Sequence, residues 1–173
     1  MDFMTRAQSL IHGDLHTGSI FINEDSTMVF DPEFCFYGPM GYDIGNVIAN
    51  MIFAWANGDV YGNSEFCAWV EEVIVDVVDL TMKKLRAYYE EHVTDTMCKN
   101  EMYKNYYLDT ILADTSAVTG LELIRRIVGM ANVKDITSIE NKEKRARAEK
   151  ICITAAIDFI KNREAKKMRK VFP

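Results

Sequence analysis

The chain has 173 residues, of which 49% are hydrophobic, and its formal net charge is -6. This length suffices for one ordinary domain with a core, and the negative charge would repel a nucleic-acid backbone. We therefore expect one globular domain, residues 1–173, that does not bind nucleic acid.

The cysteines and the apolar stretches indicate the cellular compartment of the protein. Four cysteines (Cys35, Cys67, Cys98 and Cys152) are present without a CxxC pair, so we interpret them as reduced thiols. No stretch approaches the roughly 18 to 20 continuous apolar residues of a membrane span, and the first eight residues are too polar for a signal peptide. We expect a cytoplasmic protein without membrane contact.

The first 45 residues are expected to be dominated by loops, because most glycines and all but one proline lie there. Two short apolar runs, 20–22 and 28–30, flank the polar residues 23–27. This pattern predicts a small β-hairpin whose second strand ends at Asp31.

From residue 46 onward, apolar residues recur three and four apart, which predicts a helical bundle over 46–173. We expect one helix from a Ser64 cap to about Val93, a second over roughly 99–114 and a third from about Thr115. The positions expected to face inward are Phe66, Val70, Val73, Val77, Leu80 and Leu85 in the first of these helices, and Leu121, Ile124, Ile127 and Val128 in the third.

A last helix is expected to follow a capping box formed by Thr137 and Glu140. It should carry Ile151, Ala155 and Phe159 and end in a basic tail, Lys166–Lys170. A solvated basic end suits the negative pole of a helix.

Three acids occupy positions typical of a catalytic site: Asp14 in a Gly-containing loop, Asp31 at a strand end, and Glu33 two residues later. Asp14 and Asp31 lie at the two ends of one short hairpin, so one cleft could hold both carboxylates. One or two carboxylates plus nucleotide phosphates suffice to hold magnesium. The arrangement suits phosphoryl transfer, with Asp31 and Glu33 as metal ligands and Asp14 as the base or orienting acceptor for a hydroxyl.

The run His12-Gly-Asp14-Leu-His16-Thr-Gly-Ser19 resembles the catalytic loop of the aminoglycoside phosphotransferase and choline kinase group, which shares the protein-kinase fold. The resemblance implies a mainly α fold: the C-terminal helical lobe, with a small β-hairpin carrying the catalytic and metal-binding loops of residues 1–45. That group has Asn as a second metal ligand where this chain has Ser19. We expect Ser19 and His16 to be cofactor-binding, although His16 could equally be a solvent-facing loop residue.

The runs 12–21 and 31–45 resemble the methylthioribose kinases more closely. In that family the Asp-Pro-Glu element binds magnesium, and a paired-arginine helix, matched here by Arg125 and Arg126, helps to hold the sugar and the transferring phosphate. The resemblance covers at least residues 12 to about 133. It implies a kinase that uses ATP and Mg²⁺ to phosphorylate the anomeric hydroxyl of 5-methylthioribose in methionine salvage.

The two arginines have a simpler interpretation as well. Adjacent residues on a helix point about 100° apart, so one arginine could pair with Glu122 or Asp135 on the surface. The resemblance instead assigns both Arg125 and Arg126 to the substrate site, where a guanidinium suits phosphate and vicinal hydroxyl oxygens.

Two further residues are expected to support the catalytic loop. We expect His12 to hold the loop by packing or hydrogen bonding rather than to carry protons. Asp43 resembles the buried acid of kinase-like folds that accepts backbone hydrogen bonds from this loop, without touching substrate.

Kinase-like folds place ATP between two lobes, and these 173 residues contain neither a Gly-rich phosphate loop nor its lysine. Residues 3–10 resemble the end of the helix that precedes the catalytic loop. We therefore expect the N-terminal lobe to be absent and the chain alone to have little activity. The face that would meet that lobe should expose Phe34, Phe36 and Tyr37, and a homodimer could form through it.

Two other interpretations stay open at this point. The first is a kinase for another small alcohol, such as an aminoglycoside or choline; Ser19 and the arginine pair argue against it. The second is a non-catalytic remnant or binding module that retains Asp14, Asp31 and Glu33 and binds metal or sugar without transferring phosphate.

Overall fold

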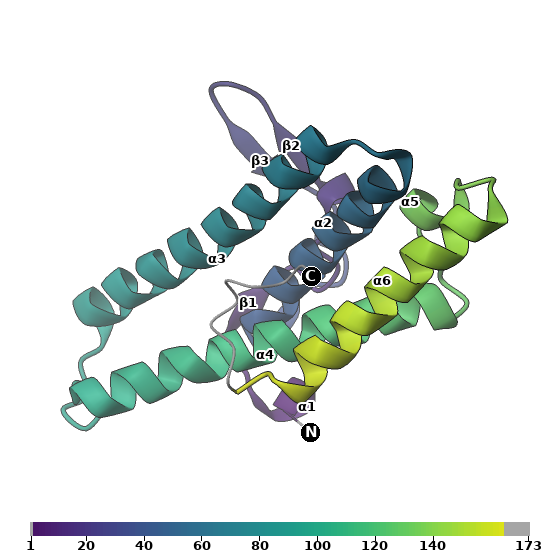
Figure 1. Cartoon of the computed structure of the whole chain (residues 1–173). Helices are drawn as coiled ribbons and strands as arrows, with labels where there is room; N and C mark the ends of the chain where they lie inside the picture. The colour runs from purple at the N-terminus through teal and green to yellow at the C-terminus, as the bar shows by residue number, and fades with distance from the viewer. Residues whose placement is uncertain (1, 165–173) are drawn as a thin grey trace.

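The computed structural model describes residues 2–164, which fold into helices with a small β part (Figure 1). The mainly α fold class is confirmed, whereas the basic tail expected at Lys166–Lys170 lies outside the described residues. In chain order the elements are α1 (Asp2–Thr5), β1 (Ser9–Ile11), the 3-10 helix η1 (Thr17–Ser19), β2 (Ile20–Ile22), β3 (Thr27–Val29), β4 (Phe36–Gly38), α2 (Gly41–Tyr61), α3 (Ser64–His92), α4 (Glu101–Val128), α5 (Lys134–Thr137) and α6 (Lys142–Lys161).

The β part consists of two antiparallel pairs. Strands β2 and β3 form the predicted hairpin, with Ile20 opposite Val29. Its turn is closed by Asn23, whose side-chain oxygen accepts hydrogen bonds from the backbone N–H groups of Asp25 and Ser26. Strands β1 and β4 pair as well, and this pair was not predicted, because three-residue strands so far apart in the sequence leave no alternating pattern.

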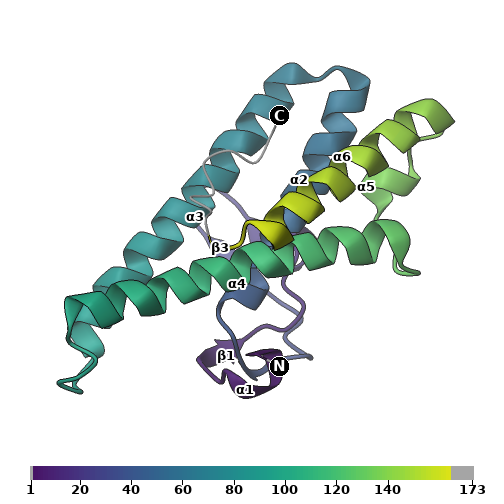
Figure 2. The ribbon, with the colours of Figure 1, turned by 60° about the horizontal axis from the view of Figure 1, so that its bottom comes forward.

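Helix α4 is the central helix and packs most extensively against α2 and α6 (Figure 2). In the middle of α4, the buried residues are small or bear a hydroxyl group: Thr115, Ser116, Thr119 and Gly120. Ser116 donates to the carbonyl of Phe159 in α6 (2.9 Å), and Thr119 donates to the carbonyl of Gly45 in α2 (3.2 Å). These short side chains allow the three helix backbones to approach closely.

Two glycines at the start of α2 set how close α2 and α4 come. A Cβ at Gly41 would lie 2.6 Å from the backbone nitrogen of Thr115, and one at Gly45 would lie 2.8 Å from the carbonyl oxygen of the same residue. Any side chain at either position would therefore push the first turns of α2 away from α4.

The main hydrophobic core lies among α2, α3, α4, α5 and α6. Its fully buried members include Ile48, Ile52, Phe53, Ile74, Leu123, Ile139, Cys152 and Phe159. No helix within residues 2–164 is both long enough and apolar enough to span a bilayer.

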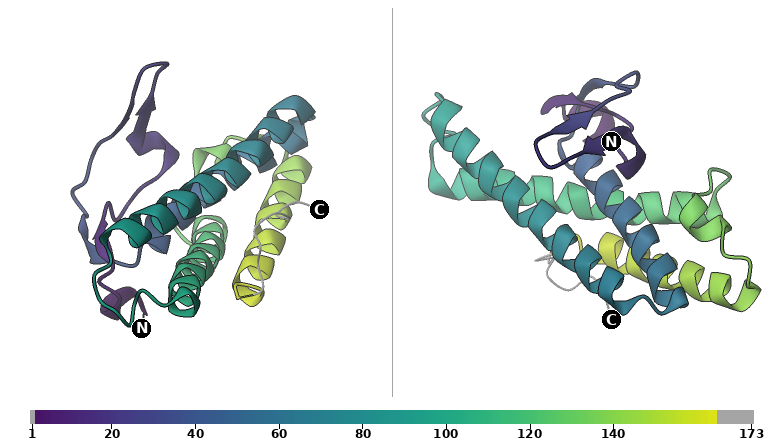
Figure 3. Two further views of the ribbon diagram at one scale, coloured as in Figure 1. Left: turned by 90° about the vertical axis from the view of Figure 1, so that its left-hand side faces the viewer. Right: turned by 90° about the horizontal axis from the view of Figure 1, so that it is seen from above.

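The inner face of α3 differs partly from the expected one. Val70 is buried as predicted, but the other buried residues are Cys67, Ile74 and Val78, whereas Leu80 is 53% exposed. Helix α3 diverges from the core toward its C-terminal end, and its last turns meet the first turns of α4 (Figure 3), where Arg86 donates to Asn105 and Glu90 pairs with Lys104. The residues of this outer half therefore face solvent on more than one side.

The expected break in α4 was wrong, because residues 101–128 form one continuous helix. Thr115 looked like a helix start but is a buried residue whose hydroxyl donates to the carbonyl of Ile111 one turn earlier. The expected inner side of this segment was partly wrong too. Ile124 and Ile127 pack against the core, but Leu121 and Val128 are exposed.

Two expected helix caps were also wrong, and asparagines take their places. The side chain of Asn63, not Ser64, accepts from the Phe66 N–H group at the start of α3. The side chain of Asn141 caps α6, whereas Thr137 belongs to α5 and donates to the carbonyl of Val133. Asn and Ser are equally good caps, so the sequence alone could not choose between neighbours.

The close α2–α4 contact predicts the effect of replacing Gly45 by alanine. In an exposed helix this change would stabilise by about 1 kcal/mol through helix propensity. Here the added Cβ meets backbone atoms of Thr115 and Thr119, so we expect G45A to destabilise by roughly 1–3 kcal/mol in urea unfolding. Replacing the exposed Ala68 in α3 by glycine is the control for propensity alone, and a G45A protein more stable than the parent would contradict the packing argument.

Candidate active site

The loop that carries Asp14 is fixed by the first turn of α2. The two carboxylate oxygens of Asp43 accept hydrogen bonds from the backbone N–H groups of His12 (2.6 Å) and Gly13 (3.0 Å). Asp43 lies at the N-terminal end of α2, where the helix dipole favours a negative charge. Its position relative to α4 is set by the neighbouring Gly41 and Gly45.

The His12 side chain connects this loop to the end of the β2–β3 hairpin. Its Nε2 atom lies 2.9 Å from the carbonyl oxygen of Phe30, and its Nδ1 atom lies 3.4 Å from the backbone nitrogen of Asp14. One neutral tautomer satisfies both contacts, with Nε2 donating and Nδ1 accepting. His12 therefore links the backbone of Asp14 to the residue that precedes Asp31.

His16 and Ser19 form a tight turn between the loop and strand β2. The His16 ring accepts from the Gly18 N–H group (3.0 Å), and the Ser19 hydroxyl accepts from the His16 N–H group (3.1 Å). Ser19 is only 3% exposed, and its hydroxyl also reaches the His16 carbonyl at 3.0 Å. Both side chains expected to be cofactor-binding thus make their contacts inside the loop.

Asp31 and Glu33 lie on the loop between β3 and β4, and both are exposed. Asp31 has φ 68°, a left-handed conformation that is uncommon for residues other than glycine and that Asp tolerates better than most.

Gly13 is the point where the loop of Asp31 and Glu33 packs against the loop of Asp14. It has φ 84°, and a Cβ there would run into the carbonyl group of Phe34. The residue before Asp14 therefore touches the residue after Glu33. Two carboxylates suit magnesium, which prefers hard oxygen ligands; no group of three or more metal-binding side chains occurs within residues 2–164.

The two arginines lie in the last turn of α4, and a single buried acid holds both. Glu122, 5% exposed, accepts from Arg125 through Nε (2.6 Å) and a terminal nitrogen (2.9 Å) and from Arg126 through Nε (2.7 Å). The alternative of pairing with Glu122 thus occurs for both arginines, but at a buried carboxylate rather than on the open surface.

The electrostatics show which groups lie near the arginines. Burial acts to raise the pKa of Glu122, but the hydrogen bonds from Arg125 and Arg126 outweigh it and leave that pKa below its ordinary value. The hydrogen bond to Glu122 raises the pKa of Arg125, and the nearby carboxylate of Asp14 acts in the same direction. Asp14 is therefore within electrostatic reach of Arg125.

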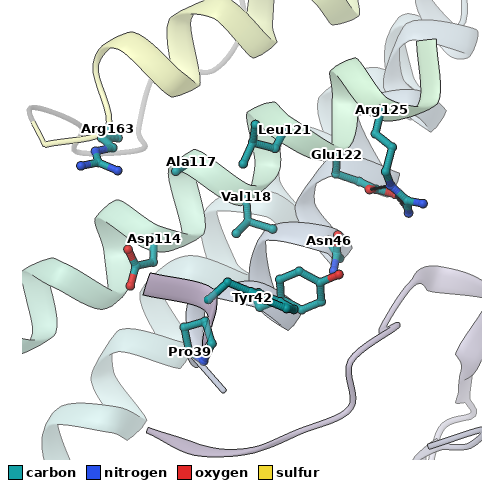
Figure 4. A pocket seen from close by; sticks show the side chains of 11 residues that line it. Pro39, Tyr42, Asn46, Asp114, Ala117, Val118, Leu121, Glu122, Arg125 and Arg163 are labelled. Carbon is teal, nitrogen blue, oxygen red and sulfur yellow. Dashed lines mark hydrogen bonds and ion pairs between the residues drawn. The ribbon is translucent and has the colours of Figure 1, made fainter. Parts of the chain in front are cut away.

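A hollow of about 370 Å³ runs along α4 from Arg125 and Glu122 to Asp114 and Arg163 (Figure 4). Its middle is mostly apolar; the lining includes Phe3, Pro39, Tyr42, Ala117, Val118 and Leu121. Asp14, Asp31 and Glu33 do not line it. Asp14 is linked to the hollow through its electrostatic effect on Arg125, which lies at one end of it.

The face around the hairpin and the β3–β4 loop exposes apolar side chains. Phe34 is 58% and Tyr37 is 69% exposed, as expected for this face. Phe36 was expected to be exposed but is only partly so, because its ring packs against Phe3 at a centroid distance of 5.2 Å. The hairpin residues Phe21, Ile22 and Met28 are exposed too, with Phe21 and Ile22 on opposite sides of the ribbon.

The sequence interpretation did not give a role in the site to two residues that shape it, Gly13 and Glu122. Glu122 stands three and four residues before the two arginines, a spacing at which helical side chains meet. That spacing was a usable signal for the contact but not for its burial. Nothing in the sequence around Gly13 indicates that the second loop packs on it.

Comparison with known proteins adds independent evidence. Residues 3–65 match the phosphotransferase enzyme family. The chain is 36% identical to methylthioribose kinase 1 of Oryza sativa subsp. japonica, with 93% of this chain and 41% of that protein aligned. It is 36% identical to the methylthioribose kinase of Escherichia coli O45:K1 (strain S88 / ExPEC), with 98% of this chain and 44% of that protein aligned. Identity to the methylthioribose kinase of Bacillus cereus (strain B4264) is 40%, over 92% of this chain and 39% of that protein. The chain thus spans about two-fifths of the length of these relatives.

The contact between the two loops predicts the effect of a G13A substitution. The added Cβ combines an unfavourable φ with a clash against the Phe34 carbonyl group, so we expect a loss of roughly 1–3 kcal/mol in unfolding free energy. G62A is the matched control, because Gly62 has φ 76° but no atom within 4 Å of its added Cβ. Equal losses for G13A and G62A would show that the loops do not press on each other at Gly13.

Proposed function

We propose that this chain, a relative of the methylthioribose kinases and of the phosphotransferase enzyme family, provides the acceptor-side half of a small-molecule kinase site. The observation that carries the proposal is the convergence of three segments around Asp14. Asp43 holds the backbone of its loop, Gly13 presses that loop against the loop of Asp31 and Glu33, and the charge of Asp14 reaches Arg125.

In the proposed reaction, a substrate hydroxyl attacks the γ-phosphorus of ATP. Asp14 accepts the hydroxyl hydrogen bond and takes up the proton as the new O–P bond forms, and ADP leaves with the electron pair of the broken bond. The role of Asp14 is mainly to orient the hydroxyl, since phosphoryl transfer depends on position and charge more than on covalent chemistry.

Asp31 and Glu33 are the residues that would hold magnesium in this site. Bound between these carboxylates and the nucleotide phosphates, the ion would neutralise charge on the phosphate oxygens. The left-handed backbone at Asp31 and the exposure of both side chains support this assignment.

The other expected site residues take supporting roles in the proposal. Arg125 and Arg126 act on the sugar and the transferred phosphoryl group, with Arg125 the nearer to Asp14. His12 and Asp43 hold the loop backbone. His16 and Ser19 shape the turn on the nucleotide side; the internal bonds of Ser19 favour this role over direct metal ligation.

The substrate proposed is 5-methylthioribose, and the nucleotide is ATP. The names of three relatives at 36–40% identity favour this sugar over an aminoglycoside or choline. These relatives are more than twice as long as this chain, so the complete reaction is proposed for the chain joined to their remaining part. Cytoplasmic location and association through the exposed apolar face remain predictions.

A chimeric enzyme tests the proposal directly. Residues 1–173 would replace the matching segment of the Bacillus cereus methylthioribose kinase, whose sequence is 40% identical. We expect ATP-dependent phosphorylation of 5-methylthioribose, and a kcat about 10²–10⁴-fold lower in the D14N variant because the hydroxyl loses its proton acceptor. D25N, in the exposed hairpin turn, is the matched control and should retain the parent rate.

A folded chimera without activity, beside an active Bacillus parent, would favour the non-catalytic interpretation. D14N activity equal to that of D25N would remove Asp14 from the acceptor role. Faster turnover of choline or an aminoglycoside than of methylthioribose would reassign the substrate.

The proposed metal ligands give a second prediction. D31N keeps the size of the side chain and tolerates the left-handed backbone, so it removes the charge alone. We expect the Mg²⁺ concentration for half-maximal rate in the chimera to rise by about tenfold or more, with D25N unchanged. An unchanged Mg²⁺ requirement in D31N would contradict the assignment.

A further inference from the structure

Glu122 is a buried carboxylate near the C-terminal end of α4. It lies within the last two turns of α4, where the helix dipole disfavours a negative charge, and its side chain is only 6% exposed. Pairs of Glu with Arg at this spacing support a helix, but a carboxylate with so little exposure is costly to bury unless charged partners hold it. Its three hydrogen bonds all come from Arg125 and Arg126, so its role concerns the arginines.

The two arginines are held differently. Arg126, whose side chain is 20% exposed, uses Nε on Glu122 and a terminal nitrogen on the carbonyl of Ala131. Arg125, whose side chain is 51% exposed, uses Nε and one terminal nitrogen on Glu122. Glu122 therefore binds the edge of the Arg125 guanidinium that is formed by Nε and one terminal nitrogen.

The outer edge of that guanidinium stays available. Its Nη1 atom makes no hydrogen bond within residues 2–164, and one N–H of the other terminal nitrogen is likewise unused. The two parallel donors of an outer edge fit two oxygens of a phosphate or carboxylate. Asp14 and Tyr42 lie within electrostatic reach of this group, and Figure 4 shows Arg125 and Glu122 together at one end of the hollow.

We propose that Glu122 is a positioning residue that fixes the guanidinium of Arg125, with its outer edge presented to an oxyanion next to Asp14. The oxyanion is the transferred phosphoryl group, so the inference rests on the proposed function and deepens it. Arg126 supports the arrangement from the inner side, since it shares the carboxylate, is less exposed and also donates to the carbonyl of Ala131.

An orienting carboxylate has a clear physical advantage at this place. Two adjacent cations would repel each other and point apart along the helix, and a long arginine side chain samples many rotamers. One buried carboxylate neutralises half of the charge and removes most of that freedom before the ligand arrives. The N–H donors of Arg125 are then already oriented before the anion binds, so binding does not have to order them.

The test uses the full 173-residue chain with inorganic phosphate as the probe. Arginine Nε–Hε signals in ¹⁵N NMR should show Arg125 as a slowly exchanging resonance that shifts as phosphate is added. In E122Q we expect this signal to move toward the free-arginine position and the phosphate affinity to fall about tenfold, because a hydrogen bond to a charged partner is lost. E122D, which keeps the charge on a shorter stem, should recover part of the affinity.

Two further variants separate positioning from a purely structural role. E149Q breaks the comparable Arg145–Glu149 pair of α6 (2.9 Å) and should leave phosphate affinity unchanged. R125Q should lose the phosphate response, and the double variant E122Q/R125Q should bind no more weakly than R125Q alone. If Glu122 had a purely structural role, the double variant would bind phosphate more weakly than R125Q alone.

Phosphate affinity within twofold of the parent in a folded E122Q protein would overturn the inference. So would a parent chain whose Arg125 signal does not respond to phosphate. These outcomes are distinct from a failure of the proposed function, which is measured by the activity of the chimera and of its D14N variant.

Discussion

The structure of the candidate site depends on one close contact, the approach of the first turns of α2 to the middle of α4 at Gly41 and Gly45. Within those same turns, Asp43 holds the backbone of the loop that carries Asp14. Two turns beyond Thr119, α4 ends with the arginines. A packing contact without any side chain therefore determines the distance between a loop acid and a helix-end cation, groups that are far apart in the sequence.

The same contact explains why the family-like run of residues 41–45 has two glycines around an acid. The glycines face α4, and the acid faces the loop. The loop of Asp14 is thus fixed to the close α2–α4 contact, whereas the loop of Asp31 and Glu33 is joined to it through Gly13, His12 and the short β strands. Such a division suits a reaction in which acceptor geometry must stay fixed.

Sequence reasoning predicted the mainly helical class and the β2–β3 hairpin, because each depends on a local pattern; the roles of the site residues stay predictions that rest on a motif. It failed where two acceptable local choices compete. Thr115 is a plausible helix start and also a tolerable buried helix residue, and only packing against α2 decides. The fixation of both arginines by Glu122 required knowledge of burial, and the contact of Gly13 with Phe34 required the three-dimensional path of the loop.

Strands β1 and β4 have a further implication for the segment between them. Because Ile11 pairs with Phe36, the chain enters and leaves this segment at neighbouring points. The acids lie near the base of the enclosed segment, and the turn at Asn23–Ser26 lies at its far tip, in solvent. Extra residues inserted at that tip would lengthen an exposed ribbon without moving the base, so the turn is a natural place for variation in length among relatives and for attaching a spectroscopic label.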